Sequence, residues 1–69
     1  MKRQRLAAKI RQKRKEMGLT QQQLATKCDL AVRTIQYYES AYRLPRLYIY
    51  PLLEDGLELP RGSLLDETA

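Results

Sequence analysis

Histidine, tryptophan and phenylalanine are absent from this 69-residue sequence, and cysteine occurs once. One cysteine cannot form a disulfide within the chain, and the usual zinc-ligand sets and histidine-based acid–base catalysis lack their side chains. No apolar run approaches the ~18 residues of a membrane-spanning helix, and no apolar segment follows the basic N-terminus as in a secretory signal. We therefore expect a cytoplasmic protein that is not an enzyme, holds no metal or cofactor and does not enter membranes.

The length allows one small domain, since single domains usually contain about 100–200 residues. Hydrophobic residues make up 43% of the sequence, which is enough to build a core. A fold of this size buries only about 60% of its unfolded surface, so we expect a free energy of unfolding of roughly 3–10 kcal/mol. We assign the domain to residues 1–65 and treat residues 66–69 as an acidic C-terminal tail.

Basic and acidic residues are separated along the chain. Residues 1–19 contain eight Lys or Arg and one Glu, whereas residues 47–69 contain one basic and five acidic residues. The net charge of +5 and the pI of about 9.7 are typical of a protein that approaches phosphates. Anionic lipid, an acidic protein, or a helix surface that is merely kept soluble would also fit this charge.

Hydrophobic spacing predicts an amphipathic first helix. At about 100° per residue, Leu6, Ile10 and Met17 share one stripe, and most Lys and Arg residues lie off it. Arg14 is the exception, because it lies only about 80° from Leu6 and therefore needs a partner. Gly18 is expected to end this helix as a left-handed C-terminal residue.

A second and a third helix follow. Thr20 and Gln23 predict a capping box at the start of a second helix that runs to about Cys28, a lone cysteine on its inner side that we interpret as a core residue. A third helix is expected to start at residue 31 or 32 and to run to residue 40. Its outer face carries Val, Arg, Gln and Tyr, and such side chains can contact base edges: Arg binds guanine, Gln binds adenine and Val contacts the thymine methyl.

One or two further helices are expected within residues 47–65. A proline inside a helix removes a hydrogen bond and clashes with the preceding turn, at a cost of about 3 kcal/mol or more. The fourth helix therefore either starts near Tyr50, with Pro51 in its first turn, or is kinked there, and Gly56 is expected to end it. Residues 47–53 form the most apolar stretch and are our candidate dimer surface, while the tyrosines around them either line an interface or pack in the core.

The stretch GLTQQQLA at residues 18–25, followed by Leu30, Ile35, Glu39 and Pro45, resembles the helix-turn-helix of the phage repressor and Cro family, the XRE family. The resemblance spans about residues 6–65. It implies an all-α, five-helix, lambda-repressor-like domain whose second and third helices straddle the major groove of DNA.

The resemblance also implies roles for individual residues. Arg14 and Glu39 correspond to a partly buried ion pair that ties the first helix to the third, the alternative being two exposed solubility charges. Gln21, with Gln22 beside it, corresponds to the place where the second helix meets a phosphate, the alternative being plain helix surface. The complete set of expected DNA-binding residues is Gln21, Gln22, Val32, Arg33, Gln36, Tyr37 and Arg43.

Several residues depart from the family pattern. Ala31 replaces the usual Ser or Thr before the third helix, which loses a cap of about 0.5–2 kcal/mol. Asp29 stands where Gly is usual, and Pro51 and Glu54 interrupt the apolar pattern of the fourth helix. The fourth helix is consequently the part of the fold that the sequence defines least.

The function implied by the resemblance is a sequence-specific, double-stranded DNA-binding transcriptional regulator. We expect a small Cro-like repressor that binds a two-fold symmetric operator as a homodimer, with the third helix in the major groove. The alternative is a protein-interaction module, such as the antitoxin of a toxin–antitoxin pair, for which the apolar residues 47–53 and the acidic tail would contact a protein partner.

Overall fold

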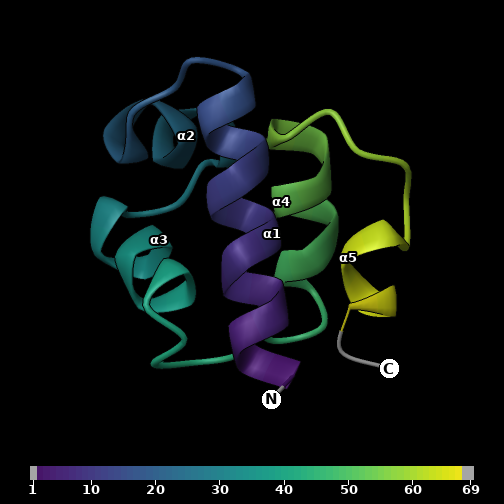
Figure 1. Cartoon of the computed structure of the whole chain (residues 1–69). Helices are drawn as coiled ribbons and strands as arrows, with labels where there is room; N and C mark the ends of the chain where they lie inside the picture. Colours follow the sequence, from purple (N-terminus) through teal and green to yellow (C-terminus); the bar gives the residue numbers. More distant parts are fainter. Residues whose placement is uncertain (1, 68–69) are drawn as a thin grey trace.

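The structure, a computed structural model, describes residues 2–67, and all regular structure in this range is helical. The five helices are α1 (Lys2–Glu16), α2 (Gln21–Cys28), α3 (Val32–Glu39), α4 (Ile49–Gly56) and α5 (Ser63–Asp66). In the view of Figure 1, α1 crosses the middle of the molecule, with α2 and α3 on one side of it and α4 and α5 on the other. α3 packs against α1 and α2, while α4 packs against α2 and α5. The predicted all-α, five-helix fold is confirmed.

A single hydrophobic core receives side chains from all five helices. The largest apolar side chains with under 2% exposure are Leu6, Ile10, Leu24, Ile35, Leu53, Leu57 and Leu64. The predicted inner stripe of the first helix is therefore confirmed for its first two members. Met17 lies just beyond the end of α1 and packs half-buried against the core. Gly18 has the predicted left-handed conformation, with φ of +72°.

Pro51 is the third residue of α4, because the helix begins at Ile49. The sequence left two arrangements open, and the structure has the one with Pro51 in the first turn of the helix. Backbone N–H groups in the first turn have no acceptor within the helix, so proline removes no helical hydrogen bond there. The helix ends at Gly56, as predicted.

Glu54, the second departure in α4, is 1% exposed. Its Oε2 accepts hydrogen bonds from the backbone N–H groups of Gly62, at 2.9 Å, and Leu64, at 3.1 Å. A buried carboxylate is costly unless it is hydrogen-bonded. Here the first turn of α5 supplies the donors, so Glu54 holds α5 against α4.

The acidic end of the chain partly belongs to the folded domain. Asp66 is the last residue of α5, and Glu67 Oε1 lies 3.8 Å from Arg5 Nη2 on α1. Residues 68 and 69 of the predicted tail lie outside the described residues. Within residues 2–67, no helix is both long enough and apolar enough to cross a membrane.

Cys28 and Gly56 mark a close approach of α2 to α4. Cys28 is 2% exposed, and a Cβ atom added to Gly56 would overlap its Sγ. Burial raises the pKa of Cys28 to about 11, so the side chain is a neutral thiol near pH 7. Cys28 is the core residue that the sequence predicts.

We expect Gly56→Ala to destabilise the protein. Alanine normally stabilises a helix by about 1 kcal/mol relative to glycine, but the overlap with Sγ should reverse the sign and cost about 1–3 kcal/mol. The double variant Cys28→Ala/Gly56→Ala should recover this loss relative to Cys28→Ala alone. Urea unfolding followed by circular dichroism measures the cycle, and strictly additive effects would contradict the contact.

Candidate nucleic-acid interface

The carboxylate of Glu39 joins the first three helices. Arg14 Nε donates to Glu39 Oε2 at 2.7 Å and Arg14 Nη2 donates to Oε1 at 3.0 Å, while Gln21 Nε2 donates to Oε1 at 3.2 Å. The carbonyl oxygen of Glu39 accepts from Arg11 Nη1 at 2.9 Å. The side chains of the ion pair are 12% and 4% exposed, and their hydrogen bond raises the pKa of Arg14. This bidentate ion pair fixes the end of α3 relative to α1 and α2.

The start of α2 presents two backbone N–H groups. Thr20 Oγ1 accepts from the Gln23 N–H at 3.1 Å, and Gln23 Oε1 accepts from the Thr20 N–H at 2.8 Å, so the predicted capping box is confirmed. The N–H groups of Gln21 and Gln22 have no acceptor among residues 2–67. They lie at the positive end of a helix, which favours an anion such as a phosphate. The Gln21 side chain, in contrast, is committed to Glu39.

α3 begins without a side-chain cap. Ala31 has the extended backbone of a capping residue, with φ of −71° and ψ of 147°, but its methyl group accepts no hydrogen bond. Before it, Asp29 adopts the left-handed conformation that its position requires, with φ of 59° and ψ of 43°. The polypeptide therefore reaches α3 through the usual helix-turn-helix geometry despite both departures.

The predicted contact residues of α3 share one side of the helix. Arg33 and Gln36 are exposed, while Val32 and Tyr37 are half-buried. Neither Arg33 nor Gln36 makes a side-chain hydrogen bond or ion pair within the part of the chain that the structure describes. Their polar groups are therefore available to a partner.

Tyr37 takes part in an aromatic stack after α3. Its ring centroid lies 5.3 Å from that of Tyr42, with the planes inclined at 41°. The Cζ atom of Arg43 lies 5.3 Å from the Tyr37 centroid and 5.7 Å from the Tyr42 centroid. Such cation–π contacts restrict a long side chain, so Arg43 is held beside the end of α3. The sequence did not indicate that Tyr42 would contact Arg43.

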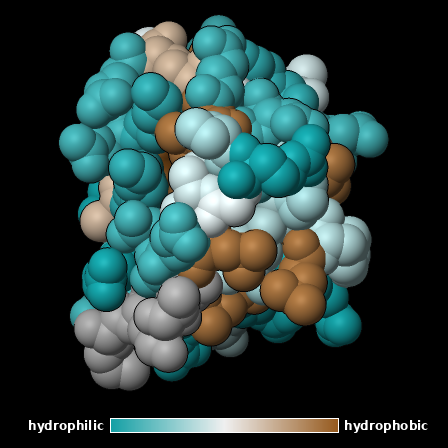
Figure 2. Space-filling model, turned by 90° about the vertical axis from the view of Figure 1, so that its right-hand side faces the viewer, coloured by the Kyte–Doolittle hydropathy of each residue, from teal (hydrophilic) through white to brown (hydrophobic). Residues whose placement is uncertain are grey.

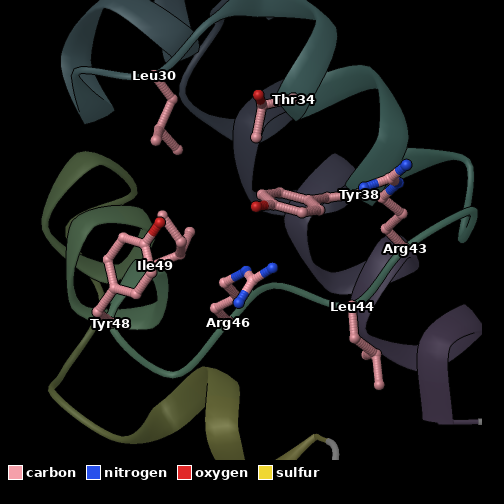
Figure 3. Close-up of a pocket in the computed structure, with 8 residues that line it drawn as sticks. All are labelled: Leu30, Thr34, Tyr38, Arg43, Leu44, Arg46, Tyr48 and Ile49. Atoms are coloured by element: carbon pink, nitrogen blue, oxygen red, sulfur yellow. The ribbon is translucent and has the colours of Figure 1, made fainter.

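Arg46 is a basic residue that our sequence analysis did not include in the interface. It is exposed on the loop before α4 and, together with Arg43, lines a pocket of about 250 Å³ between α3 and the start of α4 (Figure 3). The sequence could have indicated that this loop is basic, since residues 40–48 contain two arginines and no acidic residue.

The two groups of candidate phosphate contacts lie on opposite flanks of α3. At about 100° per residue, Glu39, which contacts Gln21, and Tyr37, which contacts Arg43, are about 160° apart around the helix. Gln36 and Arg33 fall between them. The N-terminus of α2 and the loop that carries Arg43 and Arg46 thus border one exposed face of α3. Side chains on this face can hydrogen-bond to base edges.

Comparison with known proteins agrees with this geometry. A family model described as helix-turn-helix matches residues 10–63. The chain belongs to the XRE family of helix-turn-helix proteins. It is a DNA-binding transcriptional regulator of that family.

A solved structure resembles this helix-turn-helix protein over nearly its whole length. It is the crystal structure of a tyrosine-to-phenylalanine mutant of the restriction-modification controller protein C.Esp1396I. The TM-score is 0.86 at 25% sequence identity, and the match covers 99% of this chain and 86% of the other. A comparison with curated protein sequences finds no significant match.

We expect Glu39→Ala to cost about 3–5 kcal/mol of unfolding free energy, because it leaves the Arg14 guanidinium without its carboxylate in a mostly buried position. Asp55→Ala is the matched control, since it breaks the pair with Arg61 at 3.5 Å, in which both side chains are more than 60% exposed, and should cost no more than about 1 kcal/mol. Urea unfolding measures both variants. Equal losses would show that the Glu39 pair does not hold the helices together.

Proposed function

We propose that this regulator binds one specific, two-fold symmetric DNA sequence as a homodimer and represses transcription by occluding the polymerase. α3 would lie in the major groove, where Arg33, Gln36 and Val32 read bases. The N–H groups at the start of α2 and the side chain of Arg43 would bind backbone phosphates and set the register. The two half-sites would be centred about 34 Å apart, one turn of DNA.

The observation that carries this proposal is the exposed face of α3 between the N-terminus of α2 and the loop that carries Arg43. A protein that only coated DNA electrostatically would need basic residues but no exposed Gln beside a half-buried Val on one helix face. The polar groups of Arg33 and Gln36 have no partners within residues 2–67. Base edges in the major groove offer partners of matching geometry.

The surface for a second copy of the chain lies around the loop before α4. The large hydrophobic residues with the greatest exposure include Leu47, at 75%, and Tyr48, at 68%. Figure 2 shows hydrophobic residues gathered in the lower half of the face that α5 lies on. Exposed apolar area of this kind is typical of a protein interface. The candidate dimer segment of the sequence analysis, residues 47–53, remains a proposal, although Tyr50 and Leu53 within it are buried in the core.

The genes that this protein regulates can be sought first in one class of promoter. The structural neighbour is a restriction-modification controller protein, so promoters of restriction-modification genes are the first candidates for the operator. The general test is selection of the purified protein on a random duplex library at near-physiological salt. An enriched inverted repeat supports the proposal, whereas absence of enrichment from a folded protein contradicts it.

A protein-interaction module is the second candidate function, and the same exposed residues favour it. In that case a complex with a protein partner would survive Arg33→Ala but be lost on Tyr48→Ala. Tyr50→Ala does not discriminate, because Tyr50 is 3% exposed and its truncation would damage the core.

We expect Arg33→Ala and Arg43→Ala to weaken DNA binding in different ways. Loss of Arg33 should cost about 1–3 kcal/mol on the selected duplex and remove the preference at one base pair. Loss of Arg43 should weaken all duplexes by a similar factor and reduce the slope of log affinity against log salt by about one. Fluorescence anisotropy on selected and scrambled duplexes, with Arg61→Ala as the control, measures both. Identical behaviour of Arg33→Ala on the two duplexes would exclude base reading by this residue.

We expect Leu47→Asp to weaken self-association by about tenfold or more, because it places a charge where a leucine would be buried between two copies. The variant should remain folded, since Leu47 is exposed in the monomer. Ala8→Asp adds the same charge at an exposed position of α1 and is the matched control. Sedimentation equilibrium measures the dissociation constant, and an unchanged value for Leu47→Asp would place the dimer contact elsewhere.

A further inference from the structure

Two arginines of α1 hold the backbone at the C-terminal end of α3. Arg11 Nη1 donates to the carbonyl oxygen of Glu39, the last residue of α3, at 2.9 Å. Arg3 Nη1 donates to the carbonyl oxygen of Tyr42 at 3.4 Å, where the loop after α3 passes beside the N-terminal half of α1 (Figure 1). Neither guanidinium group forms an ion pair within residues 2–67. Both contacts therefore fix the path of the backbone and do not neutralise a charge.

The carbonyl group of Glu39 depends on α1 for its hydrogen bond. The last four carbonyl groups of a helix receive no N–H group from the helix itself. In α3, the carbonyl groups of residues 36–38 accept from the backbone N–H groups of residues 40–42. The carbonyl of Glu39 is the one that remains, and Arg11 is its donor. The last hydrogen bond of α3 is thus supplied by another helix.

The turn after α3 contains a residue in an unfavourable conformation. Ala41 has φ of 63°, in the left-handed region that a Cβ atom disfavours and that glycine usually occupies after a helix. The turn is therefore not favoured by its own sequence and needs contacts from outside. The bonds from Arg11 and Arg3 end on residues 39 and 42, on either side of Ala41.

This turn joins the two parts of the proposed DNA interface. Gln36 lies on the exposed face of α3 about one turn before Glu39, and Arg43 follows Tyr42 in the loop. The guanidinium group of Arg43 lies against the Tyr42 ring, 5.7 Å from its centroid. The backbone position of the turn consequently sets where Arg43 stands relative to the side chains of α3.

We propose that Arg11 is a positioning residue for sequence recognition. Its bond to the Glu39 carbonyl fixes the turn after α3, and thereby the place of Arg43 relative to the base-reading face. Arg11 acts through Glu39 and not by contact with DNA. The inference rests on the proposed function. On the selected sequence, base and phosphate contacts must form together, whereas a scrambled duplex binds through phosphates alone, so loss of this geometry affects the selected sequence more.

The first measurement is amide hydrogen exchange of the intact chain without DNA. Arg11→Met keeps most of the side-chain length but has no hydrogen-bond donor. We expect the Tyr42 amide, whose hydrogen bond closes the turn, to exchange about tenfold faster in this variant. The Leu24 amide, which belongs to α2, should exchange at the wild-type rate. An unchanged rate at Tyr42 would overturn the proposal.

The second measurement compares affinities for selected and scrambled duplexes. Lys15→Met is the matched control, because Lys15 is exposed about one turn further along α1 and makes no hydrogen bond or ion pair among residues 2–67. Each variant removes one positive charge and should weaken both duplexes slightly. Only Arg11→Met should also lower the ratio of the two affinities, by about three- to tenfold.

A direct role of Arg11 on DNA gives a different result. In that case Arg11→Met weakens both duplexes by one common factor and lowers the slope of log affinity against log salt by about one more than Lys15→Met does. Arg11 is then a phosphate ligand, and its assignment as a positioning residue is wrong.

The double variant Arg11→Met/Ala41→Gly tests whether the turn is what Arg11 holds. Glycine adopts the left-handed conformation without the strain of a Cβ atom, so the turn should form without the arginine. We expect the double variant to recover most of the discrimination that Arg11→Met loses. A double variant that discriminates no better than Arg11→Met would contradict the proposed route through the turn.

The inference and the proposed function fail in different ways. The inference alone fails when the wild-type protein selects an operator and Arg11→Met discriminates as well as Lys15→Met does. The proposed function fails when the wild-type protein selects no duplex sequence, and the role of Arg11 in specificity then fails with it. Exchange of the Tyr42 amide still shows in that case whether Arg11 holds the turn.

Discussion

The buried carboxylate of Glu39 is the interaction on which the arrangement of the first three helices depends. Ions removed from water cost several kcal/mol unless their partners are placed well, and here Arg14 from α1 and Gln21 from α2 supply those partners. Together these bonds fix the three helices relative to one another. The same placement sets the exposed face of α3 next to the start of α2, so the stability of the domain and the geometry of the proposed DNA-binding surface rest on the same residues.

A second buried carboxylate organises the other half of the molecule by different means. Glu54 has backbone N–H groups as its partners, where Glu39 has a guanidinium group. The contact of Cys28 with Gly56 links the two halves through α2 and α4. The helix-turn-helix therefore packs against a helix pair, α4 and α5, that is held together by its own buried polar contact. The domain reaches a single arrangement although it has only 69 residues.

The sequence predicted those features that depend on residues close together in the chain. The capping box at Thr20 and the left-handed Gly18 follow from local rules, and the family resemblance supplied the pairing of Arg14 with Glu39. The stack of Tyr42 on Arg43, the pocket beside Arg46 and the role of Glu54 were not predictable. Each depends on where a loop returns to the domain or on which distant N–H groups meet a side chain, and no spacing rule contains that information.

The capping of α5 by Glu54 also orders the events of folding during synthesis. A nascent chain that has emerged only as far as Gly56 contains α1 to α4, and hence the complete helix-turn-helix. It lacks both the donors for Glu54 and the side chain of Leu64, which is fully buried in the core. Domains commonly fold as units as they are made. The helices of the proposed DNA interface are thus synthesised early, but the packing that supports them is completed only when the residues of α5 leave the ribosome.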